Sequence, residues 1–269
     1  MIHPKHTSRT SRFISVFVAI SIAFMAAAPL ASAADNSPID LAAYAALLET
    51  HTQSTPDIVG TRVDYKSLKK APELKSLVAQ VKQAKPSTLD RNGKLAFWIN
   101  AYNILAIDLV AKNYPIESIK DIGSFFSPVW DVEVAKIEGT TYSLGSIEHE
   151  ILRKMGEPRI HAAIICASVS CPPLARTPFT AETLEADLNA AMQSWLTNDE
   201  KGIKINRSAR SVRISKIFDW FEEDFEAKGG ALKSIAPHVS DSDAAWLAEN
   251  GKNATISYFG YDWSLNEVK

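Results

Sequence analysis

The stretch LAFWINAYNILAIDLV, residues 95–110, decides the fold of this chain. Its apolar residues fall on nearly every side of a helix, whereas a helix at a protein surface shows a single apolar stripe. A helix of this kind is buried at the centre of its domain, and other elements must cover it. We expect Ser87 or Thr88 to cap its start and Tyr114-Pro115 to end it.

The segments on either side of this helix show helical and extended patterns. Apolar residues at helical spacing predict helices in Asp40–Thr50, Glu73–Ala84, Leu144–Met155, Ala181–Leu196, Lys216–Phe225, Ala231–Ile235 and Asp243–Glu249. Alternating or short apolar runs predict strands in Asp131–Ile137, Thr140–Tyr142, Arg159–Cys166, Ile203–Ile205, Val212–Ile214 and Thr255–Phe259. The predicted fold class is therefore α+β, a helix-rich single domain with a small, mostly antiparallel sheet.

The composition excludes several classes of protein. The 269 residues are 46% apolar and 22% charged, which is too apolar for a disordered chain. The net charge of -2 gives no broad positive field, so nucleic acid is not an expected partner. Two cysteines are too few for a disulfide-dense scaffold or an all-cysteine zinc site.

Residues 1–33 have the three parts of a secretory signal peptide. A basic start is followed by the apolar run Phe13–Leu30 and by Ala31-Ser32-Ala33, a small-residue cleavage site. The alternative is a retained membrane anchor, which the alanine-rich composition of the run disfavours. We therefore expect export to the periplasm, a mature domain at residues 34–269 and no stable membrane anchor after cleavage.

The segment from His161 to Leu174, HAAIICASVSCPPL, is the densest in reactive side chains. The oxidising compartment favours a disulfide between Cys166 and Cys171. The alternative is a nucleophilic Cys171 with His161 as its base, because a thiolate needs a nearby base or positive dipole. On a strand, His161 and Cys166 would face opposite sides, since five positions separate them. Two reduced structural thiols, or a dithiol that cycles, remain open.

Two asparagines interrupt the apolar helix. Asn100 and Asn103 lie three positions apart, hence on one helical face. Buried amides need hydrogen-bond partners, so the pair either holds a crossing backbone or lines a pocket that reads a polar ligand.

Other candidate ligand-binding residues are Glu148, His149 and Lys216. Glu148, His149 and Glu150 diverge by about 100° per residue on a helix, so the three cannot converge on one metal ion. Lys216 is expected to pair with Asp219 at i,i+3. We predict neither a metal site nor a cofactor, because no H-E-x-x-H pair, phosphate loop or dinucleotide fingerprint is present.

Six segments together resemble the domain-of-unknown-function 547 family. They are Val63–Tyr65, Phe97–Asn103, Ser146–Leu152, His161–Leu174, Ser215–Phe225 and Tyr261–Asn266. The resemblance extends from about Leu47 to Asn266, and the strings FWINAYN and CASVSCPPL are its most specific parts. It implies an exported bacterial protein of a family that also has plant members, and it implies no particular reaction.

A looser similarity links the buried helix and the later His-bearing segment to papain-like and transglutaminase-like cores. Those families place a nucleophilic cysteine at the start of that helix, where this chain offers Asn100 and no thiol. The similarity implies a distant common core, and the missing thiol argues against catalysis in that arrangement.

Two functions from different classes follow from these observations. The first is a ligand-binding module with a Cys166–Cys171 disulfide and a pocket for a small molecule or peptide. The second is a thiol-dependent hydrolase or acyl transferase acting on a peptide or amide. In that enzyme Cys171 attacks, His161 accepts the proton, and Ser168 or Ser170 with loop amides holds the oxyanion.

Overall fold

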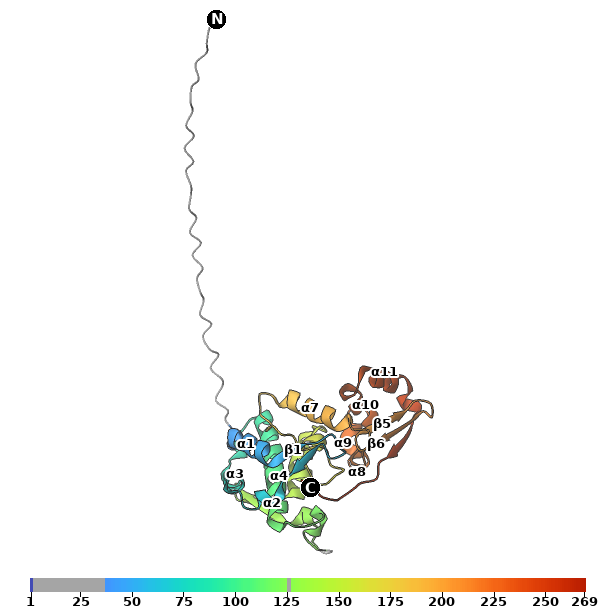
Figure 1. Ribbon diagram of the computed structural model, residues 1–269. Helices are drawn as coiled ribbons and strands as arrows, with labels where there is room; N and C mark the ends of the chain where they lie inside the picture. Colours follow the sequence, from blue (N-terminus) through green and yellow to red (C-terminus); the bar gives the residue numbers. More distant parts are fainter. Residues whose placement is uncertain (2–36, 125–126) are drawn as a thin grey trace. The chain divides into compact units, whose positions relative to one another are not determined.

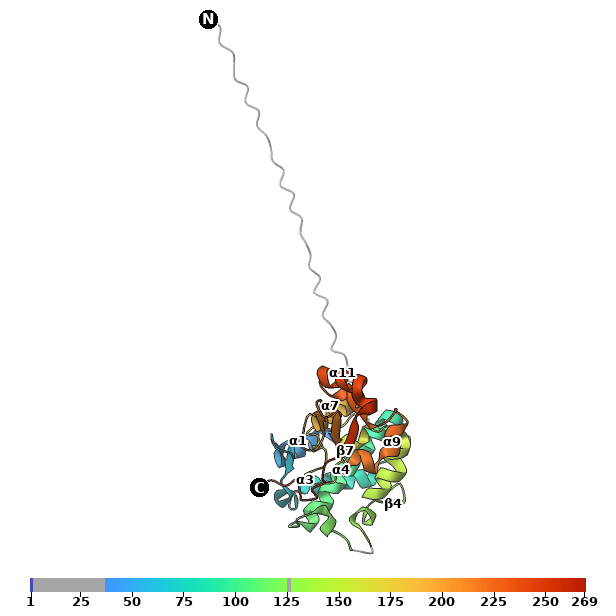
Figure 2. The ribbon, with the colours of Figure 1, turned by 90° about the vertical axis from the view of Figure 1, so that its right-hand side faces the viewer.

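The computed structural model describes Met1, residues 37–124 and residues 127–269. Apart from Met1, the predicted signal peptide lies outside the described residues. From Ser37 onward these residues form one compact unit, drawn in Figures 1 and 2. The α-helices are α1 (Leu41–His51), α2 (Tyr65–Leu68), α3 (Pro72–Gln83), α4 (Arg91–Asn113), α5 (Leu144–Ser146), α6 (Ile160–Ala163), α7 (Leu184–Leu196), α8 (Ile217–Trp220), α9 (Glu222–Glu226), α10 (Ala231–Ile235) and α11 (Asp241–Asn250).

Shorter helical turns and strands complete the described residues. The turns are η1 (Pro86–Thr88), η2 (Ile119–Asp121), η3 (Val129–Asp131), η4 (Ile147–Leu152), η5 (Arg153–Met155), η6 (Ala236–His238) and η7 (Gly251–Asn253). The strands are β1 (Thr52–Ser54), β2 (Thr61–Val63), β3 (Glu133–Ile137), β4 (Thr140–Ser143), β5 (Ile203–Asn206), β6 (Ser211–Ile214) and β7 (Thr255–Tyr258). The predicted helix-rich α+β fold is confirmed.

Helix α4 is the central element, as its apolar sequence predicts. Every residue from Leu95 to Ala111 is buried, and α2 and α3 pack against the helix beside η4 and β3 (Figure 1). The helix has the length and apolarity of a membrane span, but 94% of its most apolar window is buried inside the protein. It is therefore a core helix. Its cap is Asp90, which accepts from the Gly93 amide, and not the predicted Ser87 or Thr88.

In the part of the chain that the structure describes, three small sheets lie around the helical core. β1 pairs with β2 and β3 with β4, both antiparallel. In the third sheet β5 pairs antiparallel with β6, and β7 adds to β6 in parallel. Figure 1 labels β5 and β6, and Figure 2 labels β7. The strands predicted at 131–137, 140–142, 203–205, 212–214 and 255–259 are thus confirmed, and the first four form two antiparallel pairs.

The predicted strand Arg159–Cys166 is wrong. Residues Ile160–Ala163 form the helical turn α6, and the chain becomes extended at Ile164. The turn starts because the Ile160 and His161 amides bond to carbonyls three residues back. A short apolar run buried on all sides fits either a strand or a helical turn, and periodicity cannot separate the two.

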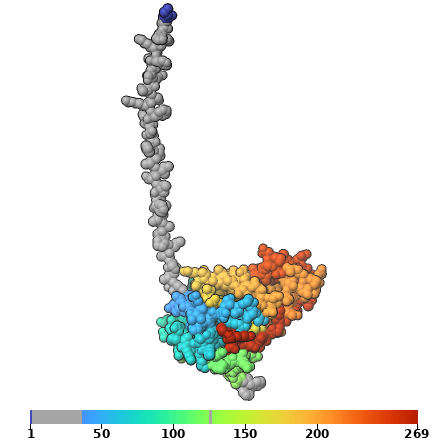
Figure 3. Space-filling model, viewed as in Figure 1, coloured from blue at the N-terminus to red at the C-terminus, as the bar shows by residue number. Residues whose placement is uncertain are grey.

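The C-terminal segment ties distant parts of the chain together. The Asn266 carbonyl accepts from the Val63 amide, and the Leu265 amide donates to the Glu117 carbonyl. Two further bonds, Val169 amide to Ser264 carbonyl and Asn266 amide to Ala167 carbonyl, attach it to the cysteine segment. In Figure 3 the red C-terminal end lies across the surface between the blue and green parts of the chain. This segment therefore fixes the loop that holds both thiols.

Candidate active site

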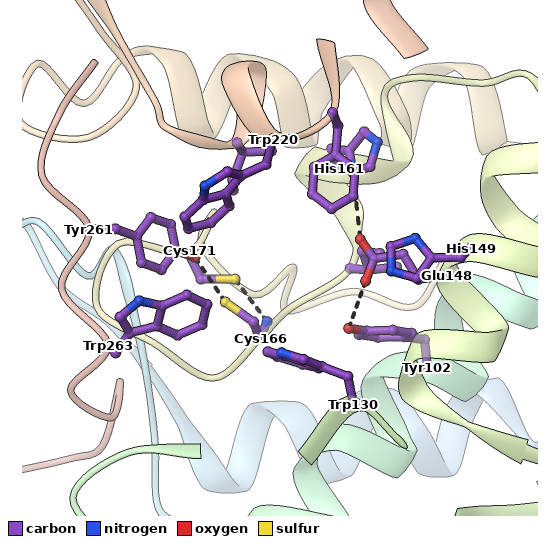
Figure 4. Close-up of a pocket in the computed structure, with 13 residues that line it drawn as sticks. Tyr102, Trp130, Glu148, His149, His161, Cys166, Cys171, Trp220, Tyr261 and Trp263 are labelled. Carbon is purple, nitrogen blue, oxygen red and sulfur yellow. Dashed lines mark hydrogen bonds and ion pairs between the residues drawn. The ribbon is translucent and has the colours of Figure 1, made fainter. Parts of the chain in front are cut away.

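A pocket of about 270 Å³ brings together side chains from most of the chain. Its lining residues are Tyr102, Trp130, Glu148, His149, His161, Ile164, Cys166, Cys171, Ile217, Trp220, Phe221, Tyr261 and Trp263. In Figure 4 four aromatic side chains surround one side of the two thiols, and the carboxyl and imidazole groups lie on the other. The pocket thus has an apolar side, a titratable side and sulfur between them.

The backbone on both sides of Cys166 is held in place. Before it, the Asn103 side chain donates to the Ala163 carbonyl and accepts from the Ile165 amide, at 2.9 and 3.0 Å. After it, Ala167 has a φ of 56°, a left-handed conformation that is uncommon for a residue with a Cβ. Such strain costs on the order of 1–3 kcal/mol and concentrates at functional sites. The bend at Ala167 turns the chain sharply next to the thiol.

The Cys166 sulfur lies in a tight group with two hydroxyls. The Ser168 Oγ is 3.0 Å away and the Tyr261 hydroxyl 2.9 Å away, and the two hydroxyls lie 3.2 Å apart. Burial alone would raise the pKa of this thiol, but hydrogen bonds from Cys171, Ser168 and Tyr261 outweigh it and lower the pKa. Burial also raises the pKa of Tyr261 well above its usual value, so its hydroxyl stays protonated as a donor. Cys166 is the thiol that this environment activates.

Cys171 is the second thiol of the pocket, and it is not bonded to the first. Both cysteines are free, and the Cys171 Sγ instead accepts the Cys166 backbone amide at 2.8 Å. The predicted disulfide is therefore absent from this structure. Burial, followed by the neighbouring Cys166, raises the pKa of Cys171 well above its usual value. The prediction that Cys166 faces away from His161 is also wrong, because it rested on a strand; both line the same pocket.

His161 is held by an acidic partner from a distant helix. Its Nε2 lies 2.7 Å from Asp224 Oδ2 in α9, and its ring stacks on Phe221 at 4.1 Å. Arg153 binds the same carboxylate at 2.7 and 3.0 Å. Burial opposes ionisation of Asp224, but its bonds to His161 and Arg153 outweigh that effect and lower its pKa to about 2. Asp224 therefore stays charged and orients the imidazole, leaving Nδ1 on the side of Glu148.

Glu148 is the second acid of the titratable side. Its Oε1 lies 3.9 Å from His161 Nδ1, and the Tyr102 hydroxyl lies 3.4 Å from its Oε2. Burial and then the charge of Cys166 raise the pKa of this carboxyl to about 7. A carboxyl with such a pKa exchanges protons at neutral pH. The mutual influence of Glu148 and Cys166 means that ionising one disfavours ionising the other.

A buried lysine lies beneath the thiol loop. Lys201 is 1% exposed, and its ammonium group donates to the carbonyls of Val59, Val169 and Cys171 at 3.0, 3.2 and 2.5 Å. Burial lowers the pKa of Lys201 to about 8, against the opposing effect of the two cysteines. The bonds to Val169 and Cys171 anchor the loop between them, and the third ties it through Lys201 to Val59.

The other predicted site residues are only partly brought together. His149 lines the pocket, and its Nδ1 lies 3.3 Å from Arg153 Nη1. Lys216 lies outside the lining set and pairs with Asp219 at 2.6 Å, as predicted. Ser170 is also not among the residues that line the pocket, and its Oγ accepts a hydrogen bond from the Asp262 amide at 2.8 Å. Among the described residues, no three His, Cys, Asp or Glu side chains are placed to hold a metal ion.

The two predicted asparagines do not line the pocket. Asn100 donates to the Phe179 carbonyl and accepts from the Phe179 amide, at 2.7 and 3.0 Å. Asn103 holds the Ala163–Ile165 backbone in the same way. Both side-chain amides form hydrogen bonds with backbone groups. They therefore hold a crossing segment of the backbone, the first of the two roles expected from the sequence.

Sequence reasoning missed several residues of the pocket. Asp224, Tyr261, Trp130, Trp220 and Trp263 come from segments far from the cysteines in the chain. The strings around Tyr261 and Asp224 are part of the family resemblance, which was the available signal for them. No periodicity or spacing rule connects a carboxylate at 224 with an imidazole at 161.

Comparison with known proteins gives one finding. Residues 86–196 match the family model described as "Protein of unknown function, DUF547". The match covers α4, Glu148, His161 and both cysteines, and it confirms the predicted family. No curated protein and no solved structure matches the chain.

Proposed function

We propose that this member of the domain-of-unknown-function 547 family is a thiol-dependent hydrolase or acyl transferase acting on peptide or amide substrates. The nucleophile is Cys166, and not Cys171 as the sequence suggested. The observation that carries the proposal is the contrast between the two thiols in one pocket. The environment of Cys166 lowers its pKa, while that of Cys171 raises it. The thiolate is the reactive form of cysteine.

The reaction needs a proton carrier beside the thiol, and Glu148 has the required properties. The Cys166 thiolate attacks the acyl carbon, and a carbon–sulfur bond forms. As the bond to the leaving amine breaks, that nitrogen takes the proton of the neutral Glu148 carboxyl. Ionised Glu148 then removes a proton from water, which attacks the thioester and releases the acid. The proton taken from water restores neutral Glu148, and Cys166 leaves as the thiolate.

His161 and Tyr261 support this step from two sides. Asp224 fixes the His161 ring, so that its Nδ1 lies on the side of Glu148, 3.9 Å from Oε1. Tyr261 lies 2.9 Å from the sulfur, so its hydroxyl is placed to donate to the oxyanion that forms on the attacked carbonyl. Ser170, considered for this role from the sequence, is instead bonded to the Asp262 amide.

The proposal places this reaction in the periplasm. The support for that location is the pattern of residues 1–33, with its basic start, apolar run and small-residue cleavage site. The substrate is a peptide or small amide that reaches the exported protein.

A binding module without turnover is the second candidate. The observation that favours it is the set of partners around Cys166 among the described residues. Its sulfur contacts the hydroxyls of Ser168 and Tyr261, and His161 contacts Asp224. In this candidate the pocket holds a ligand and the thiol serves only as a polar contact.

Acylation by p-nitrophenyl acetate separates the two candidates. The mature wild-type protein is expected to gain the mass of one acetyl group, mapped to Cys166, with a burst of p-nitrophenol. Cys166→Ala should show neither, and Cys171→Ser should keep both. Acetylation at Cys171 instead would refute Cys166 as the nucleophile. No acetylation of either thiol in folded protein would overturn the enzyme proposal and leave the binding module.

A further inference from the structure

Apart from the Tyr261 hydroxyl, the aromatic side of the pocket has no task in the chemistry described above. It consists of Trp130, Trp220, Tyr261 and Trp263, named here the aromatic wall. Trp220 lies 4.7 Å from Tyr261 and 5.7 Å from Trp263 between ring centroids, and Trp130 lies 6.3 Å from Trp263. Three segments far apart in the chain thus build one continuous surface, visible in Figure 4 around the thiols.

Trp220 is the exposed member of this wall. It is 44% exposed, one of few large apolar side chains left open to solvent among the described residues. A tryptophan buries a large apolar surface when it is covered, so leaving it open forgoes stability. Its position is nevertheless fixed by its ring contacts. A rigid, uncovered aromatic surface beside a reactive group is a preformed binding surface.

The position of the proton donor determines which part of the substrate contacts the aromatic wall. The leaving nitrogen must be near the proton donor, which is Glu148 on the titratable side. The thiols lie between that side and the aromatic wall in Figure 4. The acyl group therefore extends from the attacked carbon toward the wall.

We propose that the aromatic wall is the acyl-group subsite and that it selects substrates whose acyl group is neutral and bulky, with an aromatic or branched apolar side chain. This inference rests on the proposed function, because it takes Cys166 as the point of attack.

Charge and polarity on the wall exclude the main alternatives. The Lys120 ammonium already lies 4.9 Å from the Trp263 ring centroid, so a second cation would meet a positive charge there. A sugar would need hydrogen-bond partners for its hydroxyls. The Tyr261 hydroxyl, which lies beside the thiols, is engaged with Cys166 and Ser168. A neutral apolar group satisfies both constraints.

The size of the pocket limits the group to a single side chain. Its volume of about 270 Å³ is just under the range of about 300–1,000 Å³ of pockets for drug-sized ligands. One ring and the reacting carbonyl fit such a space, whereas an extended acyl chain of several residues does not. The remainder of the substrate leaves the pocket through its open side.

A set of p-nitrophenyl esters tests the subsite while keeping the leaving group constant. The probes are the acetyl, 3-phenylpropanoyl and 6-aminohexanoyl esters. The rate of Cys166 acylation by each is divided by its rate with free N-acetylcysteine, which removes intrinsic reactivity. We expect the normalised rate of the 3-phenylpropanoyl ester to exceed that of the acetyl ester about tenfold or more. The 6-aminohexanoyl ester should show no such gain.

Three variants assign the preference to the wall. Trp220→Ala should reduce the preference for the 3-phenylpropanoyl ester several-fold, and Trp220→Phe should restore most of it. Trp246→Ala, a matched change in α11 outside the pocket-lining set, should leave the preference intact. Because Trp220 is partly exposed, its variants are expected to fold, and a circular dichroism spectrum checks this.

The failures of the two proposals are distinguishable. If Cys166 is acylated by all three esters at equal normalised rates, the acyl-group subsite is refuted and the thiol chemistry stands. A preference for the 6-aminohexanoyl ester, or one that Trp220→Ala leaves unchanged, also refutes the subsite. If no ester acylates Cys166, the proposed function fails and the subsite fails with it.

Discussion

Two groups of buried or largely buried polar side chains meet near the segment from Ala163 to Cys166 and behave in opposite ways. On one side is the amide pair, Asn100 and Asn103, which are each 2% exposed. Each amide makes one donated and one accepted bond with backbone at 2.7–3.0 Å. On the other side is the titratable cluster of Cys166, His161 and Glu148. Ile165, whose amide Asn103 binds, directly precedes Cys166 in the chain.

The difference lies in what each group can exchange. The amides are neutral, and their partners are backbone groups that cannot leave, so the amide pair holds structure. The titratable cluster is buried among groups that shift its protonation. Burial raises the pKa of Glu148 to about 7 and lowers that of His161, and hydrogen bonds lower that of Cys166. A buried polar residue therefore has a structural role when neutral partners satisfy its hydrogen bonds. It can take part in a reaction when its pKa lies near neutral pH.

The largest expected effect is the loss of reactivity without loss of fold. Cys166→Ala should abolish acylation and hydrolysis of p-nitrophenyl acetate, because it removes the sulfur that attacks. It should lower the free energy of unfolding by only about 1 kcal/mol or less, because Ser168 and Tyr261 still bond each other. Ester turnover and urea denaturation of the same preparation measure both. If Cys166→Ala unfolds, or if it keeps ester turnover, then Cys166 is not the reactive group that the comparison with the amide pair requires.

The reverse result is expected for the amide pair. Asn103→Leu should lower the free energy of unfolding by about 1–3 kcal/mol, because the Ala163 carbonyl and Ile165 amide lose their partner. Urea denaturation measures the change, and Asn113→Leu near the exposed end of α4 is the matched control with little effect. A neutral or stabilising Asn103→Leu would show that the amide does not hold the thiol segment.

Glu148 is expected to make the protein less stable as the pH rises. Its folded pKa of about 7 lies above the ordinary value of 4.5, so the folded state holds the proton more tightly. The proton stabilises the fold below the folded pKa, and this advantage over the unfolded chain disappears as the pH rises from 4.5 through 7. Glu148→Gln should therefore be more stable than wild type by about 1–2 kcal/mol at pH 8.5 and close to it at about pH 4.

The control for that substitution is Glu150→Gln, an exposed residue of the same helical segment. It should show no such pH-dependent gain in urea denaturation at the two pH values. If Glu148→Gln is destabilised equally at both, the carboxyl is an ordinary structural residue and cannot carry the proton in the proposed reaction.

The smallest effect is expected at Lys216, which the sequence placed among the ligand-binding residues. Its partner Asp219 is 2.6 Å away, and both side chains are more than a third exposed. Lys216→Ala should change the free energy of unfolding by about 0.5 kcal/mol or less. It should also leave acylation of Cys166 unchanged in the p-nitrophenyl acetate assay. A loss of acylation would show that Lys216 contributes to the reaction although it lies outside the pocket lining.

The sequence predicts the amide pair and its helix far better than the titratable cluster. Residues 95–110 are apolar on all sides, so the burial of α4 and of Asn103 follows from local pattern. Cys166 was misplaced because Ile160–Cys166 is a short apolar run, which fits a strand as well as a helical turn. The alternation of a strand separates Cys166 from His161, which is why the sequence favours Cys171 as the nucleophile.

The rest of the site depends on contacts between distant segments. His161 and Asp224 are 63 positions apart, and Cys166 and Tyr261 are 95 apart. The pKa of each group follows from burial and from those partners, and no local pattern contains either. The left-handed conformation of Ala167 could not be predicted from the sequence either, because glycine and not alanine is the residue that favours a positive φ. What local pattern could supply was the segment, His161 to Leu174, in which the thiols lie.

The central claim is that Cys166 is the activated thiol of a folded pocket, and alkylation tests it most directly. Native wild-type protein is treated with iodoacetamide across a pH series, and the labelled cysteine is mapped by mass spectrometry. The account predicts labelling of Cys166 with a midpoint below that of free cysteine and none of Cys171 until the protein is unfolded. Faster labelling of Cys171 would contradict the account. So would a native mass two hydrogens below the reduced value with no labelling, which would reveal a disulfide.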